Sequence, residues 1–182
     1  MARIPHVTRE QLAPEDRPYF DEIAESRGSV RGPYAALMHI PRLAARIGAT
    51  GAYVRFEADL PDALREVAVL ATAREIRAQY EFSAHADPAR EAGVSEETIR
   101  AIAQGTAPRG LSGDQELVVR YVQELLRDRK VTDATFEAAR DLLGVKGIVE
   151  LTALIGHYLV MGLVLTAFEV KLGPGMKAEF PL

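Results

Sequence analysis

Three side chains that can exchange protons, Glu66, Glu81 and His85, lie in one apolar segment spanning residues 61–85. Because burying a charge without a partner is costly, such groups are expected either to pair with one another or to take part in chemistry. Glu81 and His85 are four residues apart, a spacing that puts two side chains on the same face of a helix. An imidazole titrates near neutral pH, so His85 beside a carboxyl group is a candidate for general acid–base catalysis.

The segment that must position these groups opens as a helix at residues 61–62, Pro-Asp. Proline fits the first turn of a helix, and an acidic residue there suits the helix dipole. No glycine or proline occurs near residues 75–78, so the composition predicts one unbroken helix through residue 85. In such a helix Glu66 and Glu81 would lie about 22 Å apart along the axis and could not act together. Cooperation would require a break near residues 75–78.

The rest of the chain shows helical periodicity, caps and glycine or proline stops, and no run of residues alternates with the period of a strand. We therefore expect one all-α domain over residues 1–182, a bundle of about seven or eight helices with an irregular arm over residues 1–16. Residues 105–113 are the clearest loop, because they hold three glycines and one proline. Besides the 61–85 segment, the expected helices cover residues 14–27, 34–38, 41–56, 95–105, 114–129, 134–143 and 146–172.

The composition excludes several classes of function. The 182 residues include no cysteine, which rules out disulfides, thiolate metal sites, cysteine nucleophiles and dithiol redox chemistry. A net charge of −4 argues against nucleic acid as a partner, because proteins that bind it need a basic face. The N-terminus lacks the apolar run of a signal peptide, and the most apolar stretch, residues 153–165, is shorter than the roughly 20 residues that span a bilayer. We expect a cytoplasmic protein with no membrane partner.

The chain resembles the carboxymuconolactone decarboxylase family of the alkylhydroperoxidase D-like superfamily. The resemblance rests on the order and spacing of Glu66 and of the motif over residues 78–85, which ends in His85. Peroxidase members of that superfamily carry a Cys-x-x-Cys pair, with a glutamate upstream and a histidine downstream that relay protons. Here Ala78 and Glu81 stand at the two cysteine positions, which is similar to the cysteine-free branch. The resemblance implies an alkylhydroperoxidase D-like helical fold, a chain break between the glutamate helix and the motif helix, and a homo-oligomer, either a trimer or a hexamer.

The resemblance also implies a reaction, because the decarboxylase branch removes CO₂ from an unsaturated lactone acid in aromatic compound catabolism and uses no cofactor. We expect a cofactor-independent lyase that decarboxylates, or transfers protons on, a small unsaturated or lactone carboxylic acid. His85 would be the general acid, with Glu81 orienting it or shuttling a proton and Glu66 acting as a second relay carboxylate. Tyr80 could donate to a developing oxyanion. Arg74 could bind the substrate carboxylate, since a guanidinium fork matches that shape.

Each of these residues also has a purely structural interpretation. Glu81 and His85 can be a simple stabilising pair on one helix face. Arg74 can be a surface ion-pair partner, and Tyr80 can be a core or interface aromatic. His157, in the apolar stretch near the C-terminus, is expected to be a satisfied core histidine; the alternative is that it faces a pocket.

The sequence leaves two alternatives to the lyase open. One is an antioxidant or peroxidase-like member of the superfamily that lacks the redox dithiol. The other is a non-catalytic ligand-binding or assembly protein that kept the helical shell. Glu66, Glu81 and His85 could also supply three metal ligands if they converged, but the resemblance implies neither a metal nor another cofactor, and we expect none.

Overall fold

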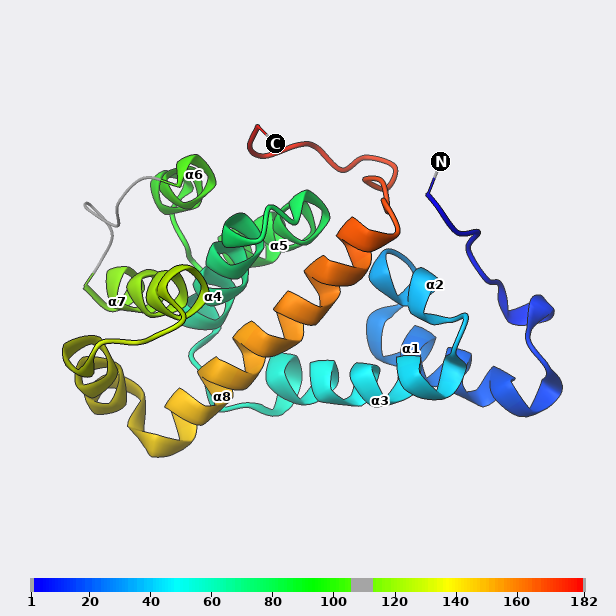
Figure 1. The fold of residues 1–182 in the computed structure, drawn as a ribbon, viewed down its shortest axis with the longest axis horizontal. Coiled ribbons are helices and arrows are strands. Elements are labelled where there is room, and N and C mark those ends of the chain that lie inside the picture. Colours follow the sequence, from blue (N-terminus) through cyan, green and yellow to red (C-terminus); the bar gives the residue numbers. More distant parts are fainter. Residues whose placement is uncertain (1, 106–112, 182) are drawn as a thin grey trace.

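Every regular element of the computed structural model, which describes residues 2–105 and 113–181, is helical (Figure 1). The all-α prediction is therefore confirmed, and the predicted loop over residues 105–113 falls mostly outside the described residues. The α-helices of the described part are α1 (Arg17–Arg27), α2 (Pro33–Leu37), α3 (Pro41–Ala52), α4 (Asp62–Glu75), α5 (Gln79–Glu91), α6 (Glu96–Gln104), α7 (Gly113–Gln123) and α8 (Asp133–Ala167). Short 3-10 or π-helical segments are η1 (Arg9–Gln11), η2 (Pro14–Asp16), η3 (Tyr53–Glu57) and η4 (Glu124–Asp128).

Helix α4 forms the centre of the larger hydrophobic core. Its residues 66–73 are all buried, and it packs against α5, α6, α7 and α8. A nearly all-round apolar surface of this kind is typical of a helix enclosed by others, whereas a surface helix shows a single apolar stripe. Helix α8 crosses between this group and a smaller core beside α1, α2 and α3 (Figure 1), and it contributes buried side chains to both.

The chain is broken at the point where its composition predicts continuity. Helix α4 ends at Glu75 and α5 begins at Gln79, so the prediction of one unbroken helix is wrong, and the break implied by the family resemblance is present. Two tertiary contacts hold the turn between them. Glu75 forms a 2.5 Å ion pair with Arg127, and Ile76 packs so closely on Gly162 that a Cβ there would overlap with it.

The turn itself is a Schellman motif, which ends a helix by satisfying its last carbonyl groups. The amide of Ala78 donates to the carbonyl of Ala73 at 2.8 Å, and the amide of Arg77 donates to the carbonyl of Arg74 at 3.2 Å. Arg77 adopts the left-handed conformation at φ 57°, a position that glycine usually takes. Helix α5 ends in the same pattern with Gly93 at that position, φ 85°. The break after α4 is therefore a regular helix end whose usual sequence marker is missing.

Helix α8 contains both of the C-terminal helices that the sequence predicts, joined at a kink. Gly144 has the non-helical angles φ 69° and ψ 174°, which separates them. The second part ends at Ala167 and does not continue to Leu172 as the sequence predicts. Just after this end, Glu169 adopts a left-handed backbone conformation, with φ 50°. By length and composition α8 could cross a membrane, but 56% of its apolar 18-residue window, with a mean hydropathy of 1.9, is buried within the protein. The helix therefore serves as a core element here.

Candidate active site

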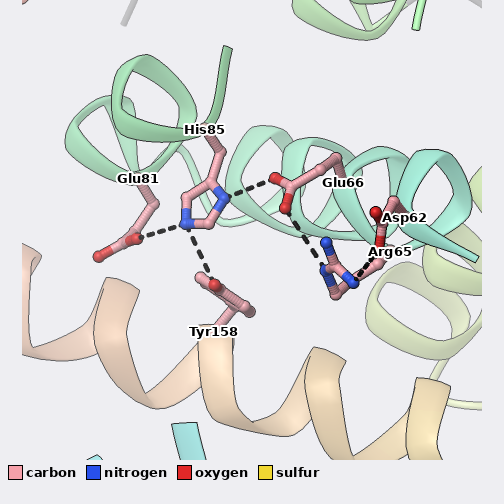
Figure 2. Close-up of polar contacts among 6 residues, drawn as sticks. All are labelled: Asp62, Arg65, Glu66, Glu81, His85 and Tyr158. Carbon is pink, nitrogen blue, oxygen red and sulfur yellow. Dashed lines mark hydrogen bonds and ion pairs between the residues drawn. The ribbon is translucent and has the colours of Figure 1, made fainter. Parts of the chain in front are cut away.

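The reversal of the chain after α4 brings His85 of α5 back against Glu66 of α4 (Figure 2). The Nδ1 atom of His85 lies 2.7 Å from Oε2 of Glu66. Both residues are buried, with exposed fractions of 4% and 3%. The sequence-based estimate of a wide separation assumed an unbroken helix and does not apply, because α5 folds back along α4.

The second ring nitrogen of His85 faces two further groups. The hydroxyl of Tyr158, on α8, lies 3.1 Å from Nε2, and the two rings meet edge to face with centroids 5.0 Å apart. Oε2 of Glu81 lies 3.9 Å from the same nitrogen, one turn earlier on α5. Sequence reasoning missed Tyr158, although it directly follows His157 in the apolar stretch that was considered.

Protonation states follow from these partners. Burial alone would raise the pKa of Glu66, but the hydrogen bond and charge of His85, together with the Arg65 guanidinium, outweigh it and hold that pKa below its usual value. Nε of Arg65 lies 3.5 Å from Oε1 of Glu66. An ionised Glu66 can only accept, so Nδ1 of His85 donates to it, and Nε2 is the ring nitrogen that faces the hydroxyl of Tyr158. Burial raises the pKa of Tyr158 well above its ordinary value, which keeps this hydroxyl protonated.

The pKa of Glu81 is shifted in the opposite direction to that of Glu66. Burial raises its pKa, and the nearby charges of His85 and Arg55 only partly offset this. One imidazole is thus flanked by a carboxyl held ionised, Glu66, and a carboxyl whose neutral form is favoured, Glu81. Environments that separate two carboxyl pKa values in this way are a mark of acid–base sites.

A cavity of about 830 Å³ opens beside this group. Its size falls in the range of small-molecule sites. Glu81, His85 and Tyr158 line it, whereas Glu66 stands behind His85 and does not. The remaining wall includes the segment between α1 and α2, the N-terminal arm and the segment after α8.

Of the two other predicted site residues, Tyr80 lines the cavity and Arg74 does not. The ring of Tyr80 lies against Gly32, which has φ 59° and leaves no room for a Cβ, and burial raises the pKa of its hydroxyl. Nε of Arg74 donates to the carbonyl of Ala103 at 2.7 Å, and its guanidinium lies over the ring of Phe180 at 4.9 Å. The structure therefore does not bring Arg74 to the site, because its side chain is engaged on the α6 side of the protein.

Three arginines that sequence reasoning did not select, Arg27, Arg31 and Arg55, line the cavity instead. His157 also lines it, so it faces the pocket. Burial and the charges of Arg27, Arg55 and His85 lower the pKa of His157 to about 4. This histidine is therefore neutral at physiological pH.

The three predicted proton carriers do not present their atoms to one point. Glu66 reaches Nδ1 of His85 and Glu81 faces Nε2, so the imidazole stands between the two carboxyl groups. Across residues 2–105 and 113–181, no group of three His, Asp or Glu side chains is arranged to hold a metal ion. What the arrangement can do is move a proton between the cavity and a buried carboxylate.

Comparison with known proteins gives one family match and a similar solved structure. The model of the carboxymuconolactone decarboxylase family matches residues 41–124, which include Glu66, Tyr80, Glu81 and His85. The crystal structure of an alkylhydroperoxidase AhpD core, an uncharacterized peroxidase-related protein from Ralstonia eutropha JMP134, is similar to this chain with a TM-score of 0.79. The match covers 95% of this chain and 93% of that one at 17% sequence identity, so it shows the fold alone. No curated protein matches the sequence. The chain is therefore similar, over residues 41–124, to the carboxymuconolactone decarboxylase family, and it is cysteine-free and has the alkylhydroperoxidase D-like fold.

Proposed function

We propose that the protein is a cofactor-independent lyase that decarboxylates, or transfers protons on, a small unsaturated or lactone carboxylic acid. The observation that carries this proposal is the buried relay from Glu66 through His85 to Glu81 and Tyr158, the last three of which line one cavity. The family match over residues 41–124, which include Glu66, Glu81 and His85, supports it.

In the proposed decarboxylation, the C–C bond to the substrate carboxylate breaks and CO₂ leaves. The electron pair of that bond passes into the conjugated carbonyl as an enolate. Protonation of the substrate carbon then collapses the enolate back to the carbonyl and completes the reaction. Transfer of a proton without loss of CO₂ needs the same acid, so both reactions use one set of groups.

Each group has a role that suits its environment. Glu81, whose raised pKa favours its protonated form, faces the cavity and is the proposed proton donor. His85 takes up a proton from the cavity water at Nε2 and passes it to Glu81, whose Oε2 lies 3.9 Å from that nitrogen. The ionised Glu66 behind it stabilises the positive ring that forms in transit. The hydroxyl of Tyr158 holds Nε2 in place. Tyr80 is the proposed donor to the enolate oxygen.

The test is turnover of carboxymuconolactone-type acids by the purified protein, followed as CO₂ release and loss of substrate absorbance. We expect His85→Ala and Glu81→Gln to lower kcat by at least about 100-fold, the usual contribution of a general acid. Glu116→Gln is the matched control, because Glu116 pairs with Arg120 on α7, outside the cavity. Wild-type turnover in both site variants would refute the proposal.

A thiol-dependent peroxidase assay should be negative, since a chain without cysteine has no dithiol to oxidise. Clear thiol-dependent activity would contradict the assignment of the chemistry to the carboxyl–imidazole relay.

We also propose that the protein forms a homo-oligomer, a trimer or hexamer as the family resemblance implies. Val145, Val149, Val160 and Leu163 share one face of α8 and are between 40% and 70% exposed. Burying such a face is favourable at roughly 25 cal/mol per Å². Analytical ultracentrifugation tests this: Val149→Glu with Leu163→Glu should dissociate the assembly, and a monomeric wild type would refute it.

A further inference from the structure

Cationic side chains outnumber carboxyl groups on the wall of the cavity, although the whole chain is acidic. Arg27, Arg31, Arg55 and Lys171 line it, against the carboxyl groups of Glu81 and Asp87, in a protein of net charge −4. Within residues 2–105 and 113–181, none of the three arginines has a carboxylate at ion-pair distance. Their guanidinium groups therefore retain donors for a ligand.

Arg27 is held in a fixed position at this wall. One Nη atom donates to the carbonyl of Gly48 at 2.9 Å, and the guanidinium lies 4.5 Å over the ring of Tyr34. A Cβ placed on Gly51 would lie 2.8 Å from Nη2 of Arg27 and 2.6 Å from Nε2 of His157. The guanidinium and the imidazole therefore meet at the same point of α3, and the absence of a side chain at residue 51 makes room for both.

Arg55, on η3, lies close to the same groups. It lines the same cavity as Arg27, His157 and Glu81. Tyr34 adds a donor: its hydroxyl is buried and has no hydrogen-bond partner among the described residues, and Tyr34 lines the cavity. A buried hydroxyl without a partner is costly, and a bound acceptor would remove that cost.

We propose that Arg27 and Arg55, together with the hydroxyl of Tyr34, form an anion subsite that anchors a carboxylate of the bound ligand. The subsite adjoins the relay, because His157 and Arg27 both lie against Gly51, and the neighbour of His157, Tyr158, reaches His85. Taking the anchored ligand to be the lyase substrate rests on the proposed function; the subsite itself does not. In this proposal Arg27 and Arg55, and not Arg74, bind the carboxylate.

The test is binding of 2-furoate and its neutral counterpart 2-furamide to the full chain at pH 7, measured by calorimetry or by NMR titration without turnover. Wild type should bind furoate at least about ten-fold more tightly than the amide, as expected for a charge-assisted contact. Arg27→Gln and Arg55→Gln should each weaken furoate binding about ten-fold and leave the amide unchanged. Arg55→Lys should retain part of the preference, because it keeps the charge without the planar fork.

Arg46→Gln is the matched control, since Arg46 is exposed on α3 and does not line the cavity. Circular dichroism and the melting temperature of each variant separate loss of binding from loss of folding. The proposal is overturned if wild type shows no preference for the acid over the amide. It is also overturned if both Gln variants bind furoate as wild type does, or if they weaken acid and amide equally.

The two proposals fail in different ways. If the Gln variants lose furoate binding while no carboxylic acid is turned over, the anion subsite stands and the lyase assignment falls. If His85→Ala abolishes turnover but Arg27→Gln and Arg55→Gln change neither KM nor furoate affinity, the lyase stands and the subsite falls.

Discussion

Replacing Glu66 by glutamine removes the negative charge behind His85 while keeping nearly the same shape. In the wild type this carboxylate lies 2.7 Å from Nδ1 of His85 and 3.5 Å from Nε of Arg65, and it is buried. The amide of glutamine can still accept a hydrogen bond, but it cannot stabilise a charged imidazole, and it can also rotate to donate. The relay therefore loses both its charge and its fixed tautomer.

The expected size of this effect follows from the type of bond. A buried hydrogen bond to a charged group contributes about 1.5–3 kcal/mol, which corresponds to a loss of roughly 10- to 150-fold in kcat/KM. Stability should also fall, and the sign can be worked out. Because the folded-state pKa of Glu66 is lowered, the carboxylate stabilises the fold above its unfolded pKa, and this contribution disappears as the pH falls through the folded value. The variant should be less stable at neutral pH and approach wild type in acid.

The assays are steady-state kinetics across pH, urea unfolding at several pH values, and ¹⁵N NMR of the His85 ring. In the wild type the spectrum should show a protonated Nδ1 and an unprotonated Nε2, and the variant should show a mixture. Glu116→Gln serves again as control, because its ion pair lies on the surface. An unchanged pH–rate profile, an unchanged tautomer and unchanged stability in Glu66→Gln would refute the relay.

The other predictions concern the groups around this relay and the turn that creates it. Tyr158→Phe should keep the edge-to-face ring contact with His85 but remove the donor to Nε2, lowering kcat by about 5- to 10-fold and the free energy of unfolding by about 1 kcal/mol. Because burial raises the folded-state pKa of Glu81 above its ordinary value of 4.5, wild type should lose stability as pH rises through the raised value. Glu81→Gln should not lose stability in this way, so the free energy of unfolding of the variant should rise relative to that of wild type as the pH increases, measured by urea unfolding. A difference between the two free energies that does not change with pH would contradict the raised pKa. Arg77→Gly should relieve the left-handed strain at φ 57° and raise the free energy of unfolding by about 0.5–1 kcal/mol, visible as a higher melting temperature, whereas a decrease would mean that the arginine side chain stabilises the turn.

Helix positions were predictable where the signal is local. Ser95 caps α6 by accepting from the amide of Thr98 at 3.1 Å, and Thr132 caps α8 in the same way through Thr135 at 3.4 Å. Such caps involve residues within one turn, so they can be read from adjacent positions. Gly144 marked a boundary for the same reason, because glycine adopts its backbone angles at little cost.

The break between α4 and α5 was not predictable from composition, because its left-handed residue is Arg77 rather than glycine. The contacts that hold the turn reach Arg127 and Gly162, far along the chain, and only their packing makes this conformation favourable. The same limit applies to the cavity. Arg27, Arg55 and Tyr158 come from three separate elements, and no spacing in the sequence relates them to His85.

The sequence alone determined that the chain is helical, that it has no thiol chemistry, and that Glu66, Glu81 and His85 are its candidate proton carriers. These conclusions depend on residue type and short-range spacing, which folding does not alter. The tertiary structure decided how the three groups divide the work. Glu66 and Glu81 are the same amino acid, yet one pKa is lowered and the other raised. Glu66 accepts the hydrogen bond of His85 beside Arg65, whereas Glu81 is buried and has no such bond among the described residues. These surroundings exist only once α5 has folded back along α4.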